Sequence, residues 1–284
     1  MKNYKFLALL PLLALSSCGL GGKLTDEQAE EKMDAIKEKT ASLAEDENYQ
    51  NSKMSLVLDS FDIDTDGNKT KVKETFKIES NADGETHAYY ESVAGSEKQT
   101  KDFYIVNYDD SETEDDKILY VKTYDSEAED EKEQTLCVSM GASPSEFSSA
   151  MSAFALEAAV PLAMFAAYAD PSSVVSAFES GAGEDYDVEI TYHSGINGDF
   201  SIKCVANLKA DVEVPEGSED LVGKQTTTIA TYSKNVLASF DTSTKTVSGD
   251  TSAIRGSVAY QKAKINISLP NGWKNLLDAE EEAE

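Results

Sequence analysis

Apolar and polar residues alternate along most of the chain after residue 53. In the clearest run, residues 200–214, Phe200, Ile202 and Cys204 begin an apolar side, and mainly lysine, asparagine and acidic residues form the other. A period of two is typical of strands that bury one face. Strand-like runs are therefore predicted at residues 53–63, 72–78, 85–94, 101–109, 117–125, 133–140, 186–193, 200–214, 224–241 and 252–269.

Helical spacing replaces this alternation in two places. Near the start, a capping box at Thr25 and Gln28 predicts an amphipathic helix. In the middle, residues 144–168 and 171–180 predict two further helices. The first of these is long and apolar, but Pro161 interrupts it and two glutamates lie in it. We therefore expect a helix pair that covers the sheet and not a membrane span.

The order of these elements predicts the fold class. Strands that follow one another through short turns form antiparallel meanders, whereas a parallel sheet needs a crossover between consecutive strands. Runs of fifteen residues or more exceed the usual strand length of about 5–6 and indicate strong curvature. We predict an α+β protein with one large, curved antiparallel sheet in a single domain over residues 25–272.

The first eighteen residues are organised differently. A basic start with Lys2 and Lys5 precedes an apolar run over residues 6–14. This run is shorter than the roughly 20 residues that span a bilayer, and it suits an export signal. The residues that follow it, Leu-Ser-Ser before Cys18, resemble the bacterial lipobox.

The lipobox resemblance implies that residues 1–17 are a lipoprotein signal peptide and that Cys18 receives a diacylglyceryl group and becomes the mature N-terminus. Residues 18–24 would be the lipidated cysteine and a flexible tether, and residues 273–284 form an acidic tail. The expected localisation is extracytoplasmic, with the protein anchored to the bacterial cell membrane by its N-terminal lipid. An ordinary signal peptide that ends near a cysteine is the alternative.

Charge restricts the partners. The chain has 53 acidic and 25 basic residues and a net charge of −28, so nucleic acid and anionic lipid headgroups repel it. Membrane attachment is therefore expected from acyl chains on Cys18, because two chains anchor durably where one binds only marginally. We expect no cofactor beyond this covalent diacylglycerol, no nucleic-acid partner, and a monomer.

Few residues indicate catalysis. The two histidines, His87 and His193, lie on separate strand-like runs, and no nucleophile, phosphate-loop or zinc motif accompanies them. A non-enzyme is therefore expected. Cys137 and Cys204 also lie in separate strand-like runs, and either a disulfide or two buried thiols fit their positions.

One acidic motif has the spacing of a metal loop. Asp62, Asp64 and Asp66, followed by a glycine, match the first half of a calcium-binding loop. The twelfth position of such a loop needs a glutamate and is Lys73 here. An Asp-Gly hairpin turn explains the same residues without a metal, so we expect no metal site and keep the three aspartates only as a calcium candidate.

Apolar side chains from the strands and the central helices are expected to meet on one side of the sheet, which by the same alternation also carries Ile118 and Tyr120. Methionine and phenylalanine are adaptable linings for a lipid pocket, and they are equally common in closed cores, so both alternatives stay open. The candidate lining residues are Met54, Leu56, Phe76, Ile78, Phe103, Ile105, Phe147, Met151, Phe154, Leu162, Met164, Phe165, Phe200 and Ile202.

The element order adds a second resemblance. An N-terminal helix, a meander of six strands, a helical insertion and four further strands behind a lipobox are similar to the lipoprotein carrier fold of the lipoprotein-localisation factors and the mycobacterial glycolipid-binding lipoproteins. The resemblance implies an open half-barrel whose concave face packs on the helices. It also implies an apolar cavity between sheet and helices that holds acyl chains.

Two functions fit these expectations. The first is a lipid-anchored binding protein that holds or carries a hydrophobic ligand, namely a lipid, an acyl chain or a glycolipid. The second is a non-enzymatic surface or structural lipoprotein with a closed core, which meets envelope or protein partners through an exposed tyrosine-rich sheet face. The tyrosines expected on that face are Tyr89, Tyr90, Tyr104, Tyr108, Tyr120 and Tyr124.

Overall fold

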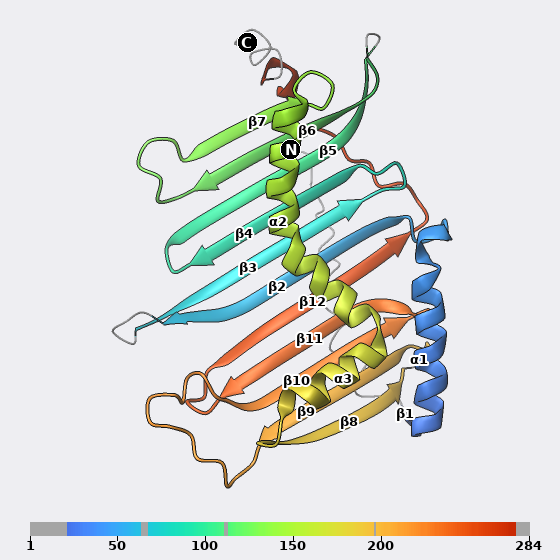
Figure 1. The fold of residues 1–284 in the computed structure, drawn as a ribbon, viewed down its shortest axis with the longest axis vertical. Coiled ribbons are helices and arrows are strands. Elements are labelled where there is room, and N and C mark those ends of the chain that lie inside the picture. The colour runs from blue at the N-terminus through green and yellow to red at the C-terminus, as the bar shows by residue number, and fades with distance from the viewer. Residues whose placement is uncertain (1–21, 64–67, 111–112, 196, 277–284) are drawn as a thin grey trace, which may run out of the picture.

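The computed structural model describes residues 22–63, 68–110, 113–195 and 197–276. Within these residues, twelve strands form one antiparallel sheet in the order β1-β8-β9-β10-β11-β12-β2-β3-β4-β5-β6-β7. The first and last strands of this order are not paired with each other, so the described sheet remains open (Figure 1). The predicted α+β class, with one large unclosed antiparallel sheet, an N-terminal helix and a central helical insertion, is confirmed.

The elements have the following bounds. The helices are α1 (Asp26–Ala41), a short 3-10 helix (Leu43–Glu45), α2 (Pro144–Ala169) and α3 (Pro171–Ala182). The strands are β1 (Gly22–Lys23), β2 (Asn51–Ile63), β3 (Lys69–Ser80), β4 (Thr86–Ala94), β5 (Glu97–Asp110), β6 (Thr113–Asp125), β7 (Glu133–Ser139), β8 (Tyr186–Ser194), β9 (Phe200–Leu208), β10 (Gly223–Ser233), β11 (Val236–Thr246) and β12 (Thr251–Gln261).

The described sheet consists of two halves that share one strand pairing. Strands β2 to β7 form one meander and β8 to β12 another, and β12 pairs with β2 between them. Arg255 of β12 holds this junction on both sides: its Nη1 donates to Asp59 Oδ2 of β2 at 2.9 Å, and its Nε donates to Asp241 Oδ2 of β11 at 3.2 Å. These two contacts link three neighbouring strands on the surface of the sheet.

Helices α2 and α3 lie on one face of the sheet, which we call the inner face (Figure 1). Helix α2 has 26 residues and is therefore about 39 Å long, enough to cross from β7 to β11. Its sheet-facing residues recur at alternating steps of four and three, which keeps them in one line along the helix. This seam consists of Phe147, Met151, Phe154, Ala158, Pro161, Phe165 and Tyr168.

Aromatic contacts hold the two ends of α2. At its start, Phe147 packs in a cluster with residues of β5, β6 and β7, and Phe154 contacts Phe103 at a ring distance of 5.4 Å. At its end, the Tyr168 ring stacks on Phe240 at 4.0 Å and its hydroxyl hydrogen-bonds the Thr242 hydroxyl at 2.7 Å. The helix is therefore fixed to both halves of the sheet.

The end of α2 depends on a glycine in β12. Phe240 pairs with Gly256 across β11 and β12. A Cβ built on Gly256 would lie 2.1 Å from Cε1 of Phe240, so the ring occupies the space that a side chain would need. Phe240 is 2% exposed and is held from the other side by Tyr168, so it cannot move aside.

The C-terminal segment after β12 covers part of the opposite face, which we call the outer face. Leu269 and Trp273 pack against a buried cluster around Tyr120, and the Trp273 ring meets Tyr108 at 5.1 Å. Asn81 Nδ2 donates to the Ile265 carbonyl at 3.0 Å and fixes the start of the segment. Trp273, which was expected to begin the tail, thus packs on the sheet.

Three expected strands differ from the structure. The run over 224–241 is a hairpin, not one strand, because Lys234 and Asn235 have φ of 53° and 64° and form a two-residue turn between β10 and β11. Neither is a glycine, so the turn carries little sequence signal. The runs over 200–214 and 252–269 continue the alternation but pair only to Leu208 and Gln261.

Both ends of α1 are closed by side chains. Thr25 and Gln28 form the predicted capping box. Beyond the other end, the Lys39 ammonium forms an ion pair with Asp46 and lies 4.6 Å from the centre of the Tyr49 ring. This ion pair and backbone donation from Asn48 hold the pKa of Asp46 at about 2.

Gly256→Ala should destabilise the protein by about 1–3 kcal/mol, because the new methyl group overpacks Phe240. The midpoint of urea unfolding measures the loss. Gly181→Ala in α3 is the matched control, because nothing lies within 4 Å of its Cβ position and alanine favours a helix by up to ~1 kcal/mol. Equal stability of Gly256→Ala and wild type would contradict this packing.

The Asp46 carboxylate should titrate near pH 2 in an NMR titration, below its ordinary value of 3.8. Because the folded pKa is the lower one, its contribution to stability is present above pH 3.8 and is lost as the pH falls through about 2. Lys39→Ala should move the midpoint toward 3.8, whereas Lys37→Ala, an exposed lysine on the same helix, should not. An unchanged midpoint in Lys39→Ala would show that the ion pair is not the cause.

Candidate functional site

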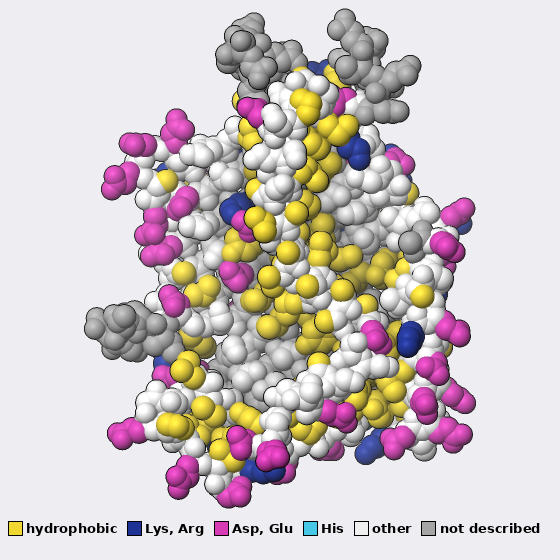
Figure 2. All heavy atoms as spheres, viewed as in Figure 1, with side chains coloured by type: hydrophobic (Ala, Val, Ile, Leu, Met, Phe, Trp, Pro, Cys, Tyr) yellow, Lys and Arg dark blue, Asp and Glu magenta, His cyan; other side chains and the backbone are white. Residues whose placement is uncertain are grey.

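The centre of the inner face carries apolar side chains that are only partly buried. Leu58 of β2 and Ile254 of β12 are cross-strand partners, and Met54, Tyr90 and Met164 pack around the same core. We call these five residues the inner patch. Figure 2 shows hydrophobic side chains along α2 and over the strands beside it, with acidic side chains gathered toward the rim of this face.

Polar contacts border the inner patch toward β5. The Tyr90 hydroxyl donates to Glu74 Oε1 at 2.8 Å, and burial together with this hydrogen bond raises the pKa of Tyr90 to about 12. The Lys101 ammonium forms an ion pair with Glu157 of α2. The patch is therefore apolar in its middle and has neutral or paired polar groups along one side, an arrangement that suits a ligand with an apolar chain.

The predicted lining residues divide into three groups. The core residues are buried and pack in two clusters: Leu56, Phe76, Ile78, Phe103, Ile105, Phe147, Phe165, Phe200 and Ile202. Met54, Met151, Phe154 and Met164 are partly buried and pack against these clusters. Leu162 is different, because it is 38% exposed. Most of the predicted set therefore forms closed core, and only its methionine-rich remainder reaches the open part of the face.

The sequence reasoning missed three members of the inner patch. Leu58 was available from the period-two pattern, since it follows the predicted inner residues Leu56 and Met54 by two and four positions. Ile254 lies on a strand for which no lining residue was predicted. Tyr90 was placed with the exposed tyrosines, although its row of the sheet contains Phe76 and Leu56 on the inner face.

Ile118 was placed on the wrong face, and Tyr120 was assigned both to the apolar side, which is wrong, and to the tyrosine-rich face. Leu119 and Val121 are the residues of β6 that contact the inner clusters, so Ile118 and Tyr120 lie on the outer face with Cys137. Residues 118–121 of strand β6 are all apolar, because the C-terminal segment covers the outer face of the strand. Alternation cannot assign a face where both faces are buried.

The outward side of α2 is apolar and exposed. Leu156 is 78% exposed and Val160 66% exposed, the highest values among the large apolar side chains of this helix. By length and composition alone, α2 is the one described helix that could cross a membrane, with a mean hydropathy of 1.6 in a window that is 22% buried. The seam residues on its other side are nevertheless packed on the sheet.

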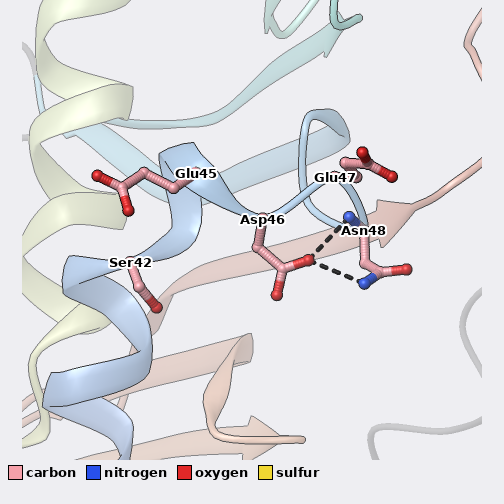
Figure 3. A pocket seen from close by; sticks show the side chains of 5 residues that line it. All are labelled: Ser42, Glu45, Asp46, Glu47 and Asn48. Carbon is pink, nitrogen blue, oxygen red and sulfur yellow. Dashed lines mark hydrogen bonds between the residues drawn. The ribbon is translucent and has the colours of Figure 1, made fainter.

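Two surface pockets are polar and contain none of the predicted lining residues. The first, about 450 Å³, lies in the loop after α1 and is lined by Ser42, Glu45, Asp46, Glu47 and Asn48 (Figure 3). There Asp46 Oδ1 accepts hydrogen bonds from the backbone and the side-chain amide of Asn48, at 3.0 and 2.8 Å. Its carboxylate is thus already satisfied.

The second pocket, about 460 Å³, lies on the outer face and is lined by Tyr89, Lys98, Thr100, Asp102, Lys122, Tyr124 and Glu133. Its Asp102 Oδ1 is 2.7 Å from Nε2 of His87, whose ring stacks on Tyr104 at 4.2 Å. Burial and the Glu91 hydrogen bond raise the pKa of Tyr89 to about 12, so its hydroxyl remains a donor at neutral pH.

The remaining candidates give no site in the part of the chain that the structure describes. There, no group of three histidine, cysteine or acidic side chains is placed to hold a metal. Asp62 is exposed near the end of β2, while Asp64, Asp66 and the lipidation candidate Cys18 lie outside the described residues. Cys137 of β7 and Cys204 of β9 lie on opposite faces and far apart in the strand order, so no disulfide joins them.

No protein-family model and no curated protein matches the chain. Among solved structures, it is similar to a β-barrel-like protein with the domain of unknown function DUF1849 from Brucella abortus, with 10% identity over 75% of this chain and 97% of that one and a TM-score of 0.18. A DUF1329 family protein from Desulfovibrio piger is 11% identical over 86% of this chain and 96% of that one, with a TM-score of 0.21. TM-scores this low carry no argument about function.

Proposed function

We propose that this protein is a lipid-anchored extracytoplasmic binding protein that holds a hydrophobic ligand, namely a lipid, an acyl chain or a glycolipid, on its inner face. The inner patch is the observation that carries the proposal, because its five apolar side chains are only partly buried beside the closed core of the inner face. Apolar surface left open to solvent marks binding sites in soluble proteins when it is extensive.

The composition of the site supports an apolar ligand. Helix α2 is fixed at both ends and crosses the sheet between them (Figure 1), and Leu58 of β2 and Ile254 of β12 are partly buried cross-strand partners. Met54 and Met164 are flexible and adapt to ligands of different shape. Each methylene group buried there contributes about 0.8 kcal/mol, so a chain of several methylenes is enough for measurable binding.

The sequence supports the anchored location. The lipobox-like residues before Cys18 provide a site for a diacylglyceryl group, and the net charge of −28 disfavours attachment through a basic surface. We propose no catalytic role, since no nucleophile, phosphate-loop or zinc motif accompanies the two histidines in the sequence. Nucleic acid is disfavoured by the same charge, and we propose a monomer.

The outer face supports a second candidate, a structural or surface lipoprotein that contacts envelope polymers or proteins. The second pocket places Tyr89 and Tyr124 beside two lysines and two carboxylates, a mixture that suits a polar polymer. The wider tyrosine face is only partly available. Tyr120 is 7% exposed, Tyr108 is packed on Trp273, and Tyr90 lies on the other side of the sheet.

Mass spectrometry of the mature protein from bacterial membranes tests the anchor. We expect a peptide that begins at Cys18 and carries a diacylglyceryl group, and we expect Cys18→Ala to release the protein into the soluble fraction. A mature N-terminus elsewhere, or membrane retention of Cys18→Ala, would contradict lipid anchoring without affecting the ligand proposal.

Leu58→Gln should weaken binding of a fluorescent fatty-acyl probe by roughly tenfold, because it removes about two methylene equivalents of apolar contact. Phe61→Gln is the matched control: it lies on the same strand, on the opposite face, and is 36% exposed. Circular dichroism checks that both variants fold. Native mass spectrometry followed by organic extraction then identifies any lipid bound to the wild-type protein.

Wild-type protein that neither retains a lipid nor takes up the probe would reject the ligand proposal. The second candidate function would then be tested next. It predicts that Tyr124→Ala weakens co-sedimentation of the protein with cell-wall polymer. Equal probe affinity of Leu58→Gln and Phe61→Gln would place the ligand elsewhere than on the inner patch.

A further inference from the structure

We propose that the outward side of α2 rests on the surface of the neutral bilayer to which the protein is anchored. The proposal concerns the side of the helix opposite its sheet-facing seam. It rests on the proposed lipid anchor and is separate from ligand binding on the inner patch.

The outward side of α2 is continuously apolar over residues 153–167. Leu156, Val160 and Leu162 are 78%, 66% and 38% exposed. The intervening exposed positions are alanines: Ala153, Ala155, Ala159, Ala163, Ala166 and Ala167. Glu157 is the one charged residue in this stretch, and it is paired with Lys101 of the sheet, so no charge remains on the outward side.

The first two turns of α2 have a different exposed surface. There the exposed residues are mainly serine and glutamate, including Ser145, Glu146 and Ser148. Helix α3 is likewise polar on its exposed side, with Ser172, Ser173 and Ser176. A helix that is apolar all round is normally buried on all sides. Residues 153–167 of α2 are apolar in composition on all sides, but only the side that faces the sheet is buried. A second apolar surface is therefore needed to cover the outward side.

The size of this outward side favours a bilayer over a protein. Fifteen residues of helix are about 22 Å long and about 10 Å wide, which gives roughly 220 Å². A stable protein interface buries about 800 Å² on each partner. A second copy of this chain that used α2 alone would therefore bury too little surface. A bilayer needs no minimum area when another link already holds the protein beside it.

The N-terminus provides that link. Cys18 precedes Gly22 by four residues, so the Cα atom that would carry the lipidated side chain lies at most about 14 Å from the start of β1. Strand β1 pairs with β8, and β8 contacts α3, which follows directly on α2. The anchor and the end of α2 therefore belong to the same half of the sheet. A short tether raises the effective concentration of the bilayer at α2, so a weak contact forms.

Charge selects the kind of bilayer. The protein has a net charge of −28, and acidic side chains surround the apolar stripe on this face (Figure 2). Anionic headgroups would repel that rim, whereas zwitterionic headgroups would not. The contact should therefore be closer on phosphatidylcholine than on mixtures with phosphatidylglycerol, and added salt should reduce the difference because it screens exposed charges.

Site-specific fluorescence on the mature lipidated protein in phosphatidylcholine vesicles tests the proposal. An environment-sensitive fluorophore is attached to Ala159→Cys on the outward side of α2, or to Lys77→Cys, which is exposed on the outer face of β3. Both native cysteines of the described sheet are buried, which limits unwanted labelling. Spin-labelled lipid should quench the fluorophore at 159 severalfold more strongly than at 77.

A charge on the outward side is the second variant. Val160→Glu, added to the labelled 159 protein, should reduce quenching to the level seen at 77, because a carboxylate does not enter the bilayer surface. Val160→Glu should leave uptake of the acyl probe unchanged. Conversely, Leu58→Gln should leave the quenching of the fluorophore at 159 unchanged. These opposite responses separate a failure of this proposal from a failure of the ligand proposal.

Three results would overturn the bilayer contact. Equal quenching at 159 and 77 would show that α2 does not meet the lipid. Strong quenching that Val160→Glu leaves unaltered would assign the effect to another part of the surface. Self-quenching at 159 that grows with protein density, without quenching by lipid, would identify a second copy as the occupant.

Discussion

The docking of α2 across an open sheet is the constraint on which the rest of this structure depends. The described sheet has two halves that share one strand pairing, and α2 is fixed to both of them by aromatic contacts. Its position determines which inner residues are sealed, as under Phe154 and Tyr168, and which stay partly open, as at Leu58. It also determines that the other side of the helix faces outward. Both proposed surfaces therefore follow from one helix.

Local patterns in the sequence predict much of this fold. The capping box at Thr25 and the period-two runs of the first meander depend on residues close in sequence, and the structure contains both. The hairpin at Lys234 and Asn235 was missed because the turn contains no glycine, and asparagine alone is a weak signal for it. The faces of β6 were missed because the segment that buries its outer side comes from residues more than a hundred positions later.

The candidate site was less predictable than the fold for a related reason. Leu56 and Leu58 are the same residue type on the same face of one strand, yet the first is 1% exposed and the second is partly open. The difference comes from tertiary packing over the strand, which no local pattern contains. Likewise, Leu156 and Val160 look like core residues in the sequence, and only the packing of α2 shows that they are not. Composition thus identifies apolar surface, and tertiary contacts decide whether it is core, site or exterior.

The pairing of β2 with β12 also has a consequence for how the chain acquires its structure. Strands β2 to β7 can pair with their sequence neighbours as soon as they are synthesised, but the other edge of β2 must wait for β12, where Ser55 meets Ser257. Until then, β2 presents a row of free backbone donors and acceptors, the feature that makes edge strands prone to pair with other chains. Contacts so distant in sequence also form slowly, because a long loop must close first. The interval between the synthesis of these two strands is therefore the period in which a newly made molecule is most vulnerable to aggregation. It ends when β12 pairs with β2 and Arg255 contacts the strands on both sides of it.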